Sequence, residues 1–515
     1  MKKKQLRWTL WTIASPFILF IILCILIYLP PIQNFLVDKA AVYASEATGM
    51  NISVGRISLS FPLNLVVTDV DAASPHNETL LSVRRLQVNV QLLPLLKKQV
   101  EVDGISLQGA TVNSNDLIHG MRLNGTLGEL FISSHGVALD PETAIVNKVL
   151  LKDTDLSLCL NDTAAADTAA SDTTYWKIIL QDIDLQNVSF ALDMPLDSLS
   201  LAASLDNAIL RDGLIDLHKS AYSLQTFRIE NGRVRYDNGK PLAADSLSSG
   251  LDPSHIALTD IGVKLDSLYY GGRNMKAIIS QFVLKERSGV EIVSATGRMV
   301  SNDKVLRVPS LKLETRDSYL ELNAAMDWNA LDFKDEGLVS ARLMADIGKP
   351  DVVRFMGSMD EKFIRQYPSE PLRIRTGIDG DLNKLKLTTL TAELPGALGL
   401  FARGELTHLT DSLLRGGDIT LEAETKDLKF VSTLAEGIEI PYGTRLEGKF
   451  TMAGTKMGTD LLLMQPEAQA VVAADTIPIT VYNDSISVAD DFKMERAARL
   501  FAKYDLSRDR YEADL

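Results

Sequence analysis

Apolar and polar residues alternate along most of the chain after residue 50, and the alternation changes phase at recurrent points. Within residues 182–194 the apolar residues stand first at odd and then at even positions, namely Ile183, Leu185, Val188, Phe190, Leu192 and Met194. Alternation with a period of two is typical of a half-buried strand. A phase change inside such a stretch predicts a strand that keeps its apolar side chains on one face across a local irregularity.

The same change of phase occurs at five other places, and each time two polar residues or glycines separate the two apolar series. The six separating pairs are Gly55-Arg56, Gln108-Gly109, Lys152-Asp153, Gln186-Asn187, Glu230-Asn231 and Asp266-Ser267. A β-bulge and a two-residue hairpin would both keep the apolar residues on one face. None of the six is Asn-Gly or Asp-Gly, the pairs that such hairpins prefer, which favours bulged, bent strands over hairpins.

These strands predict a mainly β fold, a long and bent antiparallel sheet over residues 50–515. The phase changes recur at irregular intervals, which disfavours a solenoid or propeller of fixed period. An antiparallel sheet normally packs its apolar face against another layer, as in an ordinary sandwich. Here aromatic residues make up 6% of the chain and helical patterns are few, so little is available to cover that face. We therefore predict an open hydrophobic groove, a β-taco-like architecture.

The predicted walls of the groove are apolar members of the alternating series, because alternate residues of a strand share one face. They are Leu59, Phe61, Leu107, Val112, Leu156, Leu158, Leu160, Leu185, Val188, Phe190, Leu192, Val234, Tyr236, Leu268 and Tyr270.

Other segments depart from the strand pattern. Residues 161–174 are polar and low in complexity, which predicts a flexible surface loop. Residues 351–366 and 489–505 carry apolar residues at helical spacing and predict two short helical insertions that cover sheet surface. Residues 31–49, before the strands begin, predict another short helix.

The N-terminus predicts a membrane anchor in residues 1–30. Basic residues precede residues 8–29, a run of 22 residues without a charge. A helix of that length is about 33 Å long, enough for a hydrocarbon core of about 30 Å. The alternative, a cleaved secretory signal, is disfavoured because the run is longer than a signal core and the small-residue site at 42–44 lies far beyond it. The predicted anchor residues are Trp8, Trp11, Phe17, Phe20 and Leu29.

The composition argues against several classes of function. A net charge of −14 without a dense basic run makes nucleic acid a poor partner. One of the two cysteines lies in the apolar run, so no disulfide framework is expected. The six histidines form no close pair, and the motifs of P-loops, serine hydrolases and metal sites do not occur. We expect no enzyme activity, no metal and no cofactor.

The order of these features resembles the AsmA/TamB family. The resemblance lies in the basic N-terminus, the single span, the short helix ending at Thr48-Gly49, and the stretches MNISVGRISLSFPLNLVVTDVDA and LLSVRRLQVNVQLLPLLKKQVEVDGISLQGATV. Repeated alternating stretches extend it over most of the chain. It is a resemblance to the N-terminal portion of a TamB-like translocation and assembly module protein, because the chain ends at Leu515 without the family's C-terminal domain.

The resemblance implies a single-pass protein of the inner membrane with a cytoplasmic N-terminus, most of the chain in the periplasm, and a part in outer-membrane biogenesis. One implied role is conducting phospholipids along the groove between the inner and outer membranes. The other is assembling outer-membrane or secreted proteins together with an outer-membrane barrel partner. A surface adhesin or polysaccharide binder is a weaker hypothesis, because the exposed aromatic platforms that it needs are missing. The family has no catalytic residues to transfer.

Overall fold

The computed structural model describes residues 39–514 with internal gaps. The residues outside the description are 1–38, 40, 43–44, 47, 61–63, 75–77, 91–101, 115–119, 139–141, 162–174, 240–249, 333–336, 357–360, 434–441, 467–469, 475–476, 483–484, 488–493, 506–509 and 515. The predicted membrane anchor, the groove candidate Phe61 and nearly all of the predicted surface loop therefore lie outside the described residues.

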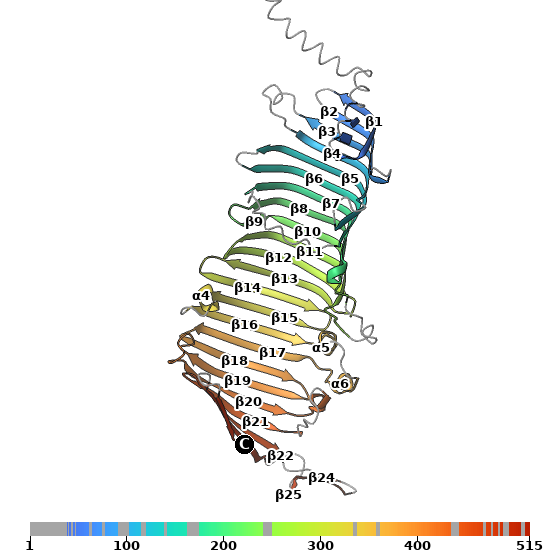
Figure 1. The fold of residues 1–515 in the computed structure, drawn as a ribbon. Coiled ribbons are helices and arrows are strands. Elements are labelled where there is room, and N and C mark those ends of the chain that lie inside the picture. Colours follow the sequence, from blue (N-terminus) through green and yellow to red (C-terminus); the bar gives the residue numbers. More distant parts are fainter. Residues whose placement is uncertain are drawn as a thin grey trace, which may run out of the picture. The chain divides into compact units, whose positions relative to one another are not determined.

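The fold is mainly β, as predicted (Figure 1). Ladders of hydrogen bonds assign 24 strands to one long sheet, and β23 (Ala470–Ala474), β24 (Ile477–Tyr482) and β25 (Ser485–Ser487) to a second sheet. The chain divides into two compact units. Unit 1 consists of Met1–Pro241 and Ser254–Gly262, and unit 2 of Leu242–Pro253 and Val263–Leu515. Strand β11 (His255–Gly271) contributes residues to both.

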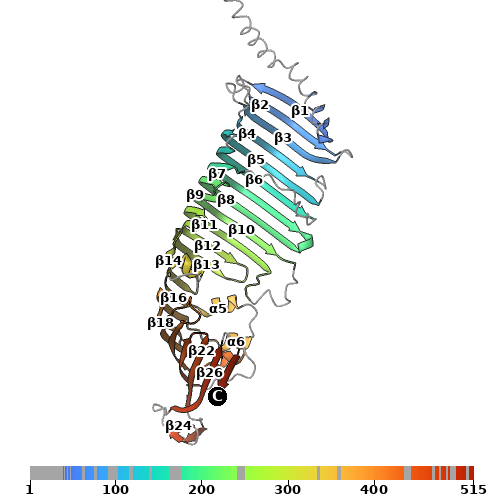
Figure 2. The same cartoon turned by 60° about the vertical axis from the view of Figure 1, so that its left-hand side comes forward.

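The strands of unit 1 run side by side, as Figure 2 shows. They pair in the order β1–β2–β3–β4–β5–β6–β7–β8–β10, and β9 also pairs with β8. Their bounds are β1 (Asn51–Ser60), β2 (Asn64–Ala73), β3 (Thr79–Val90), β4 (Val102–Asn113), β5 (Met121–Ala138), β6 (Thr143–Leu160), β7 (Lys177–Met194), β8 (Leu199–Asp216), β9 (Ala221–Leu224) and β10 (Thr226–Asp237), with the 3-10 turn η1 (Pro195–Asp197) between β7 and β8.

One pair of strands departs from the predicted antiparallel order. β6 and β7 are parallel, in register from Thr143 opposite Lys177 to Cys159 opposite Asp193. Parallel neighbours need a connection of about a dozen residues or more, because the chain must return to the starting edge. The segment between Leu160 and Lys177 is long enough for this. The prediction of a long antiparallel sheet is confirmed, and β6–β7 is an exception within it.

Unit 2 is an antiparallel meander from β12 to β22, followed by β26 and β27. Its strands are β12 (Asn274–Glu286), β13 (Glu291–Ser301), β14 (Val305–Thr315), β15 (Tyr319–Asp327), β16 (Leu338–Ile347), β17 (Leu372–Asp381), β18 (Lys384–Leu394), β19 (Leu398–Thr407), β20 (Gly416–Thr425), β21 (Arg445–Ala453), β22 (Lys456–Pro466), β26 (Met494–Asp505) and β27 (Arg510–Asp514). Its helical segments are α4 (Trp328–Leu331), α5 (Lys349–Phe355), α6 (Glu361–Gln366) and the 3-10 turn η2 (Lys429–Thr433).

The predicted helical segments have different outcomes. Residues 351–366 contain α6 and most of α5. The predicted helix at 489–505 is wrong, because Met494–Asp505 forms β26 and pairs along its length with β22. A short apolar series cannot by itself distinguish a helix from a strand, and here pairing with a neighbour decides. Within 31–49, the described positions 39, 41, 42, 45, 46 and 48 are helical.

A small closed core lies beside the β18–β19 turn in unit 2. It consists of Phe363, Tyr367, Leu394, Ala397, Leu428 and Phe430. The rings of Tyr367 and Phe430 lie 5.1 Å apart in an edge-to-face arrangement. Burial raises the pKa of the Tyr367 phenol, so its hydroxyl stays neutral. This core fixes α6 and η2 to the ends of the strands.

Candidate functional site

The phase changes of unit 1 mark a line at which the strand ladder skips a position. Between β6 and β7, Lys152 is in register with Gln186 and Thr154 with Val188, whereas the positions between them are skipped. The same skip recurs between all neighbouring strands from β1 to β10, and between β8 and β10 it includes Leu205 and Gly232. We call this line crease 1. It consists of Gly55, Asp69, Arg84, Gly109, Gly128, Asp153, Asn187, Asp206 and Asn231.

The crease 1 residue has a left-handed backbone conformation on those strands of unit 1 that run in one of the two directions. Five of its residues have a φ between +50° and +62°, namely Asp69, Gly109, Asp153, Asn187 and Asn231. Glycine, asparagine and aspartate are the residues that tolerate this region best. The five lie on β2, β4, β6, β7 and β10, which share one direction because β6 and β7 are parallel and the other pairs are antiparallel.

This geometry is neither a bulge nor a hairpin. A bulge adds a residue to one strand only, whereas crease 1 skips the same number of residues on both strands. A hairpin is excluded because each strand continues on both sides of the crease. The prediction of bulged strands was therefore wrong at the five polar pairs on β1, β4, β6, β7 and β10, and for Asp266-Ser267 on β11 it stays a prediction. Four of the six polar pairs contain a left-handed residue, which is the second member of Gln108-Gly109, Lys152-Asp153, Gln186-Asn187 and Glu230-Asn231.

A second crease crosses β6, β7 and β8. The ladder skips Asn147 and Gln181 between β6 and β7, and Gln181 and Asp212 between β7 and β8. Asp212 has a φ of +50°, and Asn147 donates to the Gln181 side chain at 2.8 Å. Sequence reasoning missed this crease. Its signal was the spacing of three between Leu180 and Ile183, which repeats the spacing at crease 1.

Apolar side chains form rows across the strands on both sides of crease 1. Register joins one row through Ile57, Val67, Leu86, Leu107, Leu130, Leu151, Leu185, Ala208 and Ile229. Beyond the crease, another row contains Ile52, Ala72, Leu81, Val112, Gly125, Leu156, Phe190, Ala203 and Val234. Directly opposed residues share a face of the sheet, so each row is a band of apolar surface without a charge.

The structure brings most of the predicted groove residues into these and neighbouring rows. Leu192 stands opposite Leu158 and Leu201, and Tyr236 also faces Leu201. Val188 faces Thr154 and Leu205, Leu160 faces Met121, and Leu59 faces Leu65. Leu268 and Tyr270 belong to the part of β11 that is assigned to unit 2.

The apolar face lies on the inside of the bend. Several of the most buried side chains of unit 1 flank crease 1, with exposed fractions of 5% for Val83, 9% for Ala110, 2% for Thr154 and 4% for Ala208. By contrast, the consecutive residues at the crease itself are exposed, as in Lys152-Asp153 and Gln186-Asn187. Side chains converge on the inside of a bend and diverge on the outside. The face is therefore concave, and we call it the trough.

The trough is only partly covered by protein. Away from the crease its side chains are half-buried, and Leu81, Ile105 and Phe190 are 36%, 37% and 39% exposed. The described residues of unit 1 thus leave large aliphatic and aromatic groups in contact with the surroundings. An exposed apolar surface of this extent is typical of a binding surface.

The opposite face of unit 1 carries most of the polar residues of these strands, and several of its charges are paired. Arg211 contacts Asp182 and Asp184, the latter at 3.0 Å, and Lys148 lies 3.9 Å from Asp184. Such pairs on a solvated face add little stability. They keep the outer face hydrated and distinguish it from the trough.

Unit 2 repeats the division into an apolar and a polar face. One row across β13 to β22 contains Ala295, Leu313, Leu320, Ala345, Ile374, Ala392, Leu400, Ala423, Leu446 and Leu463. On the other face Arg375 binds Asp346 at 2.7 Å and Lys449 lies 3.1 Å from Asp418. There, Tyr319 donates to Glu321 at 2.9 Å, and this bond raises the pKa of the tyrosine.

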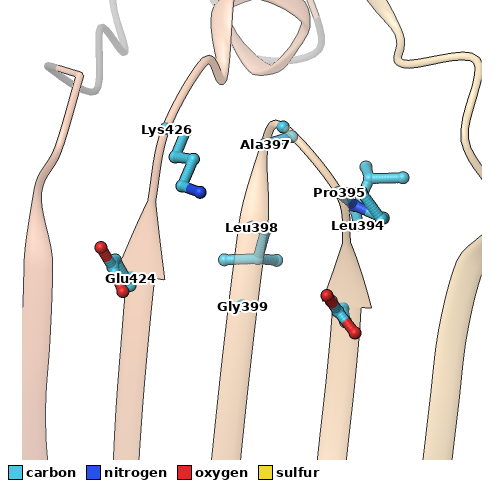
Figure 3. A pocket seen from close by; sticks show the side chains of 9 residues that line it. Leu394, Pro395, Ala397, Leu398, Gly399, Glu424 and Lys426 are labelled. Atoms are coloured by element: carbon cyan, nitrogen blue, oxygen red, sulfur yellow. The ribbon is translucent and has the colours of Figure 1, made fainter.

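Two hollows in unit 2 are small and polar at their edges. One of about 190 Å³ lies at the β18–β19 turn, where Gly399 is in register with Glu393 on one side and Glu424 on the other. Figure 3 shows Gly399 and Glu424 on neighbouring strands. The other, of about 450 Å³, is lined by residues of β20, β21 and β22, including Glu422, Glu447 and Lys449. Neither hollow is lined by a histidine or a cysteine.

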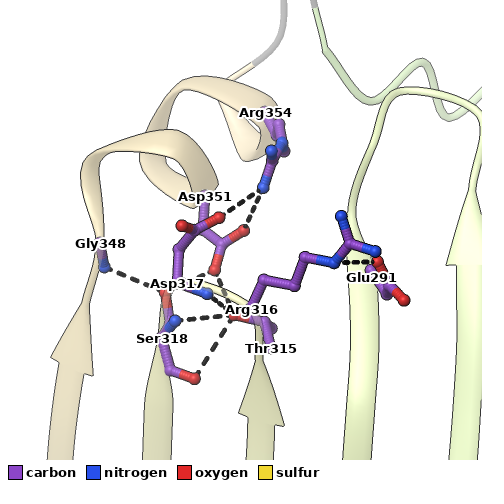
Figure 4. A network of polar contacts seen from close by, with 8 residues as sticks. All are labelled: Glu291, Thr315, Arg316, Asp317, Ser318, Gly348, Asp351 and Arg354. Carbon is purple, nitrogen blue, oxygen red and sulfur yellow. Dashed lines mark hydrogen bonds and ion pairs between the residues drawn. The ribbon is translucent and has the colours of Figure 1, made fainter.

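A buried carboxylate fixes α5 to the β14–β15 turn (Figure 4). Asp351 is 1% exposed and accepts hydrogen bonds from Thr315, from Ser318 at 2.6 Å and from Arg354 at 3.1 Å. Arg354 also donates to Asp317 at 2.8 Å. The network holds a polar cluster at the ends of the strands, away from the apolar rows.

Gly128→Ala should destabilise the sheet at crease 1. A Cβ at Gly128 would lie 2.8 Å from the Cβ of Asp153 and 2.9 Å from the carbonyl oxygens of Lys152 and Asp153. Two of these atoms belong to the backbone, so we expect a loss of about 1–3 kcal/mol, seen as faster amide hydrogen exchange in β5 and β6. The matched control is Gly399→Ala, whose new Cβ meets nothing within 4 Å. Equal exchange in the two variants would contradict the steric argument.

No family model, curated protein or solved structure matches the chain. Within the described part of the chain, no helix is long and apolar enough to cross a membrane, and no cluster of histidine, cysteine, aspartate and glutamate could hold a metal ion.

Proposed function

We propose that this chain is a lipid-conducting bridge protein of the AsmA/TamB type. Residues 8–29 anchor it in the inner membrane with residues 1–7 in the cytoplasm, and the β region extends into the periplasm. Phospholipids move along the trough between the inner and outer membranes. The observation that carries the proposal is the trough of unit 1, a concave and uncharged apolar face that the described protein leaves partly open.

The chemistry of this face suits acyl chains. Removing one CH₂ group from water is worth about 0.8 kcal/mol, so a long acyl tail gains many kcal/mol by lying against the rows of leucine, isoleucine and valine. Headgroups remain in water at the rims, where the strands end in polar turns. The chain carries no nucleotide-binding motif, so movement follows a gradient or is driven by other proteins.

A pair of crosslinking positions on β7 tests the proposal. A photoreactive residue at Leu192 lies in the apolar rows, whereas one at Ala191 lies on the opposite face of the same strand. In membranes that contain the full chain, we expect illumination to attach phospholipid at Leu192 and not at Ala191, as read by mass spectrometry. Absence of lipid at both positions would refute the proposal. Capture of unfolded outer-membrane protein at Leu192 instead of lipid would favour the assembly-factor role with a barrel partner.

A further inference from the structure

Crease 1 is a line along which the trough can bend without breaking strand pairing. The ladder hydrogen bonds of unit 1 lie on either side of the skipped positions, between pairs such as Lys152–Gln186 and Thr154–Val188. A change of angle at the skipped residues alters their own φ and ψ and leaves these pairs intact. Hinges in proteins are a few such residues that absorb a dihedral change between rigid parts.

Side chains bridge neighbouring strands at two places along this line. The Asn187 amide donates to the Asp153 carboxylate at 2.9 Å, and the Asn231 amide donates to Asp206. Arg233 lies 3.8 Å from the same Asp206 carboxylate. All of these groups stand on the outer side of the bend. There they link adjacent strands at the level where the main-chain ladder is skipped.

We propose that crease 1 is a longitudinal hinge of the trough, restrained by these two interstrand asparagine–aspartate hydrogen bonds. Opening and closing about the hinge changes the distance between the two rims of unit 1 and adapts the trough to the amount of lipid in it. The hinge depends only on the geometry of the crease, whereas its response to cargo depends on the proposed lipid function.

The residue types at the crease suit this role. Asparagine and aspartate adopt the left-handed conformation at modest cost and also carry a hydrogen-bonding group, whereas glycine would give the same backbone without a restraint. A residue other than glycine that has a left-handed backbone conformation is held in it by the surrounding structure. The parts of the sheet on either side of crease 1 are called its two facets. Removing the amide donors should therefore allow the angle between the facets to vary and leave the strand pairing within each facet intact.

The test measures the width of the trough by spin labels on the full chain, with both native cysteines replaced by serine. Labels at Leu196→Cys and Lys219→Cys report the separation of the two rims, because these residues follow opposite ends of the β7–β8 pair. Labels at Leu196→Cys and Arg235→Cys lie on one side of crease 1 and serve as the control. The variant is Asn187→Asp with Asn231→Asp, which keeps the size of both side chains and replaces each donor by a carboxylate that repels its partner.

We expect the distribution of rim-to-rim distances to broaden in the variant while the control pair stays unchanged. Asn187→Gly with Asn231→Gly, which removes the amides without adding charge, should broaden it as well. Unchanged rim-to-rim distances in both variants would overturn the hinge. Broadening of the control pair to the same extent would also overturn it, because the facets would then have unfolded.

The response to cargo is measured on the unsubstituted crease. Vesicles of phosphatidylethanolamine and phosphatidylglycerol should shift and narrow the rim-to-rim distribution. If mass spectrometry finds lipid bound and the distribution does not change, the trough is rigid towards cargo and that part of the proposal fails. If no lipid binds, the proposed function fails instead, and the comparison of the variants still decides the hinge.

Discussion

Leu192→Asp is expected to abolish lipid binding to the trough while the sheet stays folded. Leu192 stands between Leu158 and Leu201 in a row of apolar side chains. An acyl chain lying there would have to remove water from the new carboxylate. Desolvating a charge without a partner costs several kcal/mol, which corresponds to at least about a hundredfold loss of occupancy. Without lipid, the half-buried position lets the carboxylate reach water, so the sheet itself loses little.

The measurement is the phospholipid that copurifies with the full chain, quantified by mass spectrometry, with circular dichroism as a check of folding. Ala191→Asp is the matched control, because it places the same charge one residue away on the polar face. We expect the control to retain its lipid. Equal lipid content in the two variants would show that the trough is not where lipid binds.

Asp351→Ala is expected to give the largest loss of stability, about 2–4 kcal/mol, because two hydroxyls lose a buried acceptor. The carboxylate is fully buried and accepts hydrogen bonds from Thr315, Ser318 and Arg354. Its removal leaves two hydroxyls and part of a guanidinium without their acceptor. In a sheet where each strand pairs only with its neighbours, the loss should remain local.

The expected readout is faster hydrogen exchange at amides of α5 and the β14–β15 turn, with β20 and β21 unchanged. Glu361→Ala serves as the control, because its pair with Arg365 at 3.7 Å is 87% exposed on the glutamate side. Such a pair contributes little. Unfolding of both units together in Asp351→Ala would contradict the view that stability is local.

The alternation of apolar and polar residues was enough to predict a mainly β chain and a long sheet. It could not predict the direction of β7 relative to β6, because a strand has the same alternation in either direction. What permits a parallel pair is the length of chain between Leu160 and Lys177. The composition of that segment predicted a surface loop but gave no indication of the direction of the strand that follows it. For β26, apolar residues at helical spacing suggested a helix, but pairing with β22 determined the structure.

The phase change located crease 1 but did not reveal its geometry. Polar pairs such as Gln186-Asn187 are compatible with a bulge, a turn or a left-handed residue, and only the register across two strands distinguishes them. The signal available in the sequence was the residue type. Asparagine, aspartate or glycine recurs as the second member of four pairs, and these are the residues that tolerate a positive φ.

The skipped positions of crease 1 face one another on successive strands from β1 to β10. This has a consequence for how the sheet can change in length. Each added strand extends a sheet by about 4.8 Å without altering its cross-section. The left-handed residues of crease 1 fall on strands of one direction. Antiparallel strands must therefore be gained or lost two at a time, as whole hairpins. An odd number of strands can be added only where two neighbours are parallel, as β6 and β7 are. If the trough carries lipid between two membranes, as we propose, duplication of hairpins would match the protein to a wider or narrower gap without a redesign of the apolar rows.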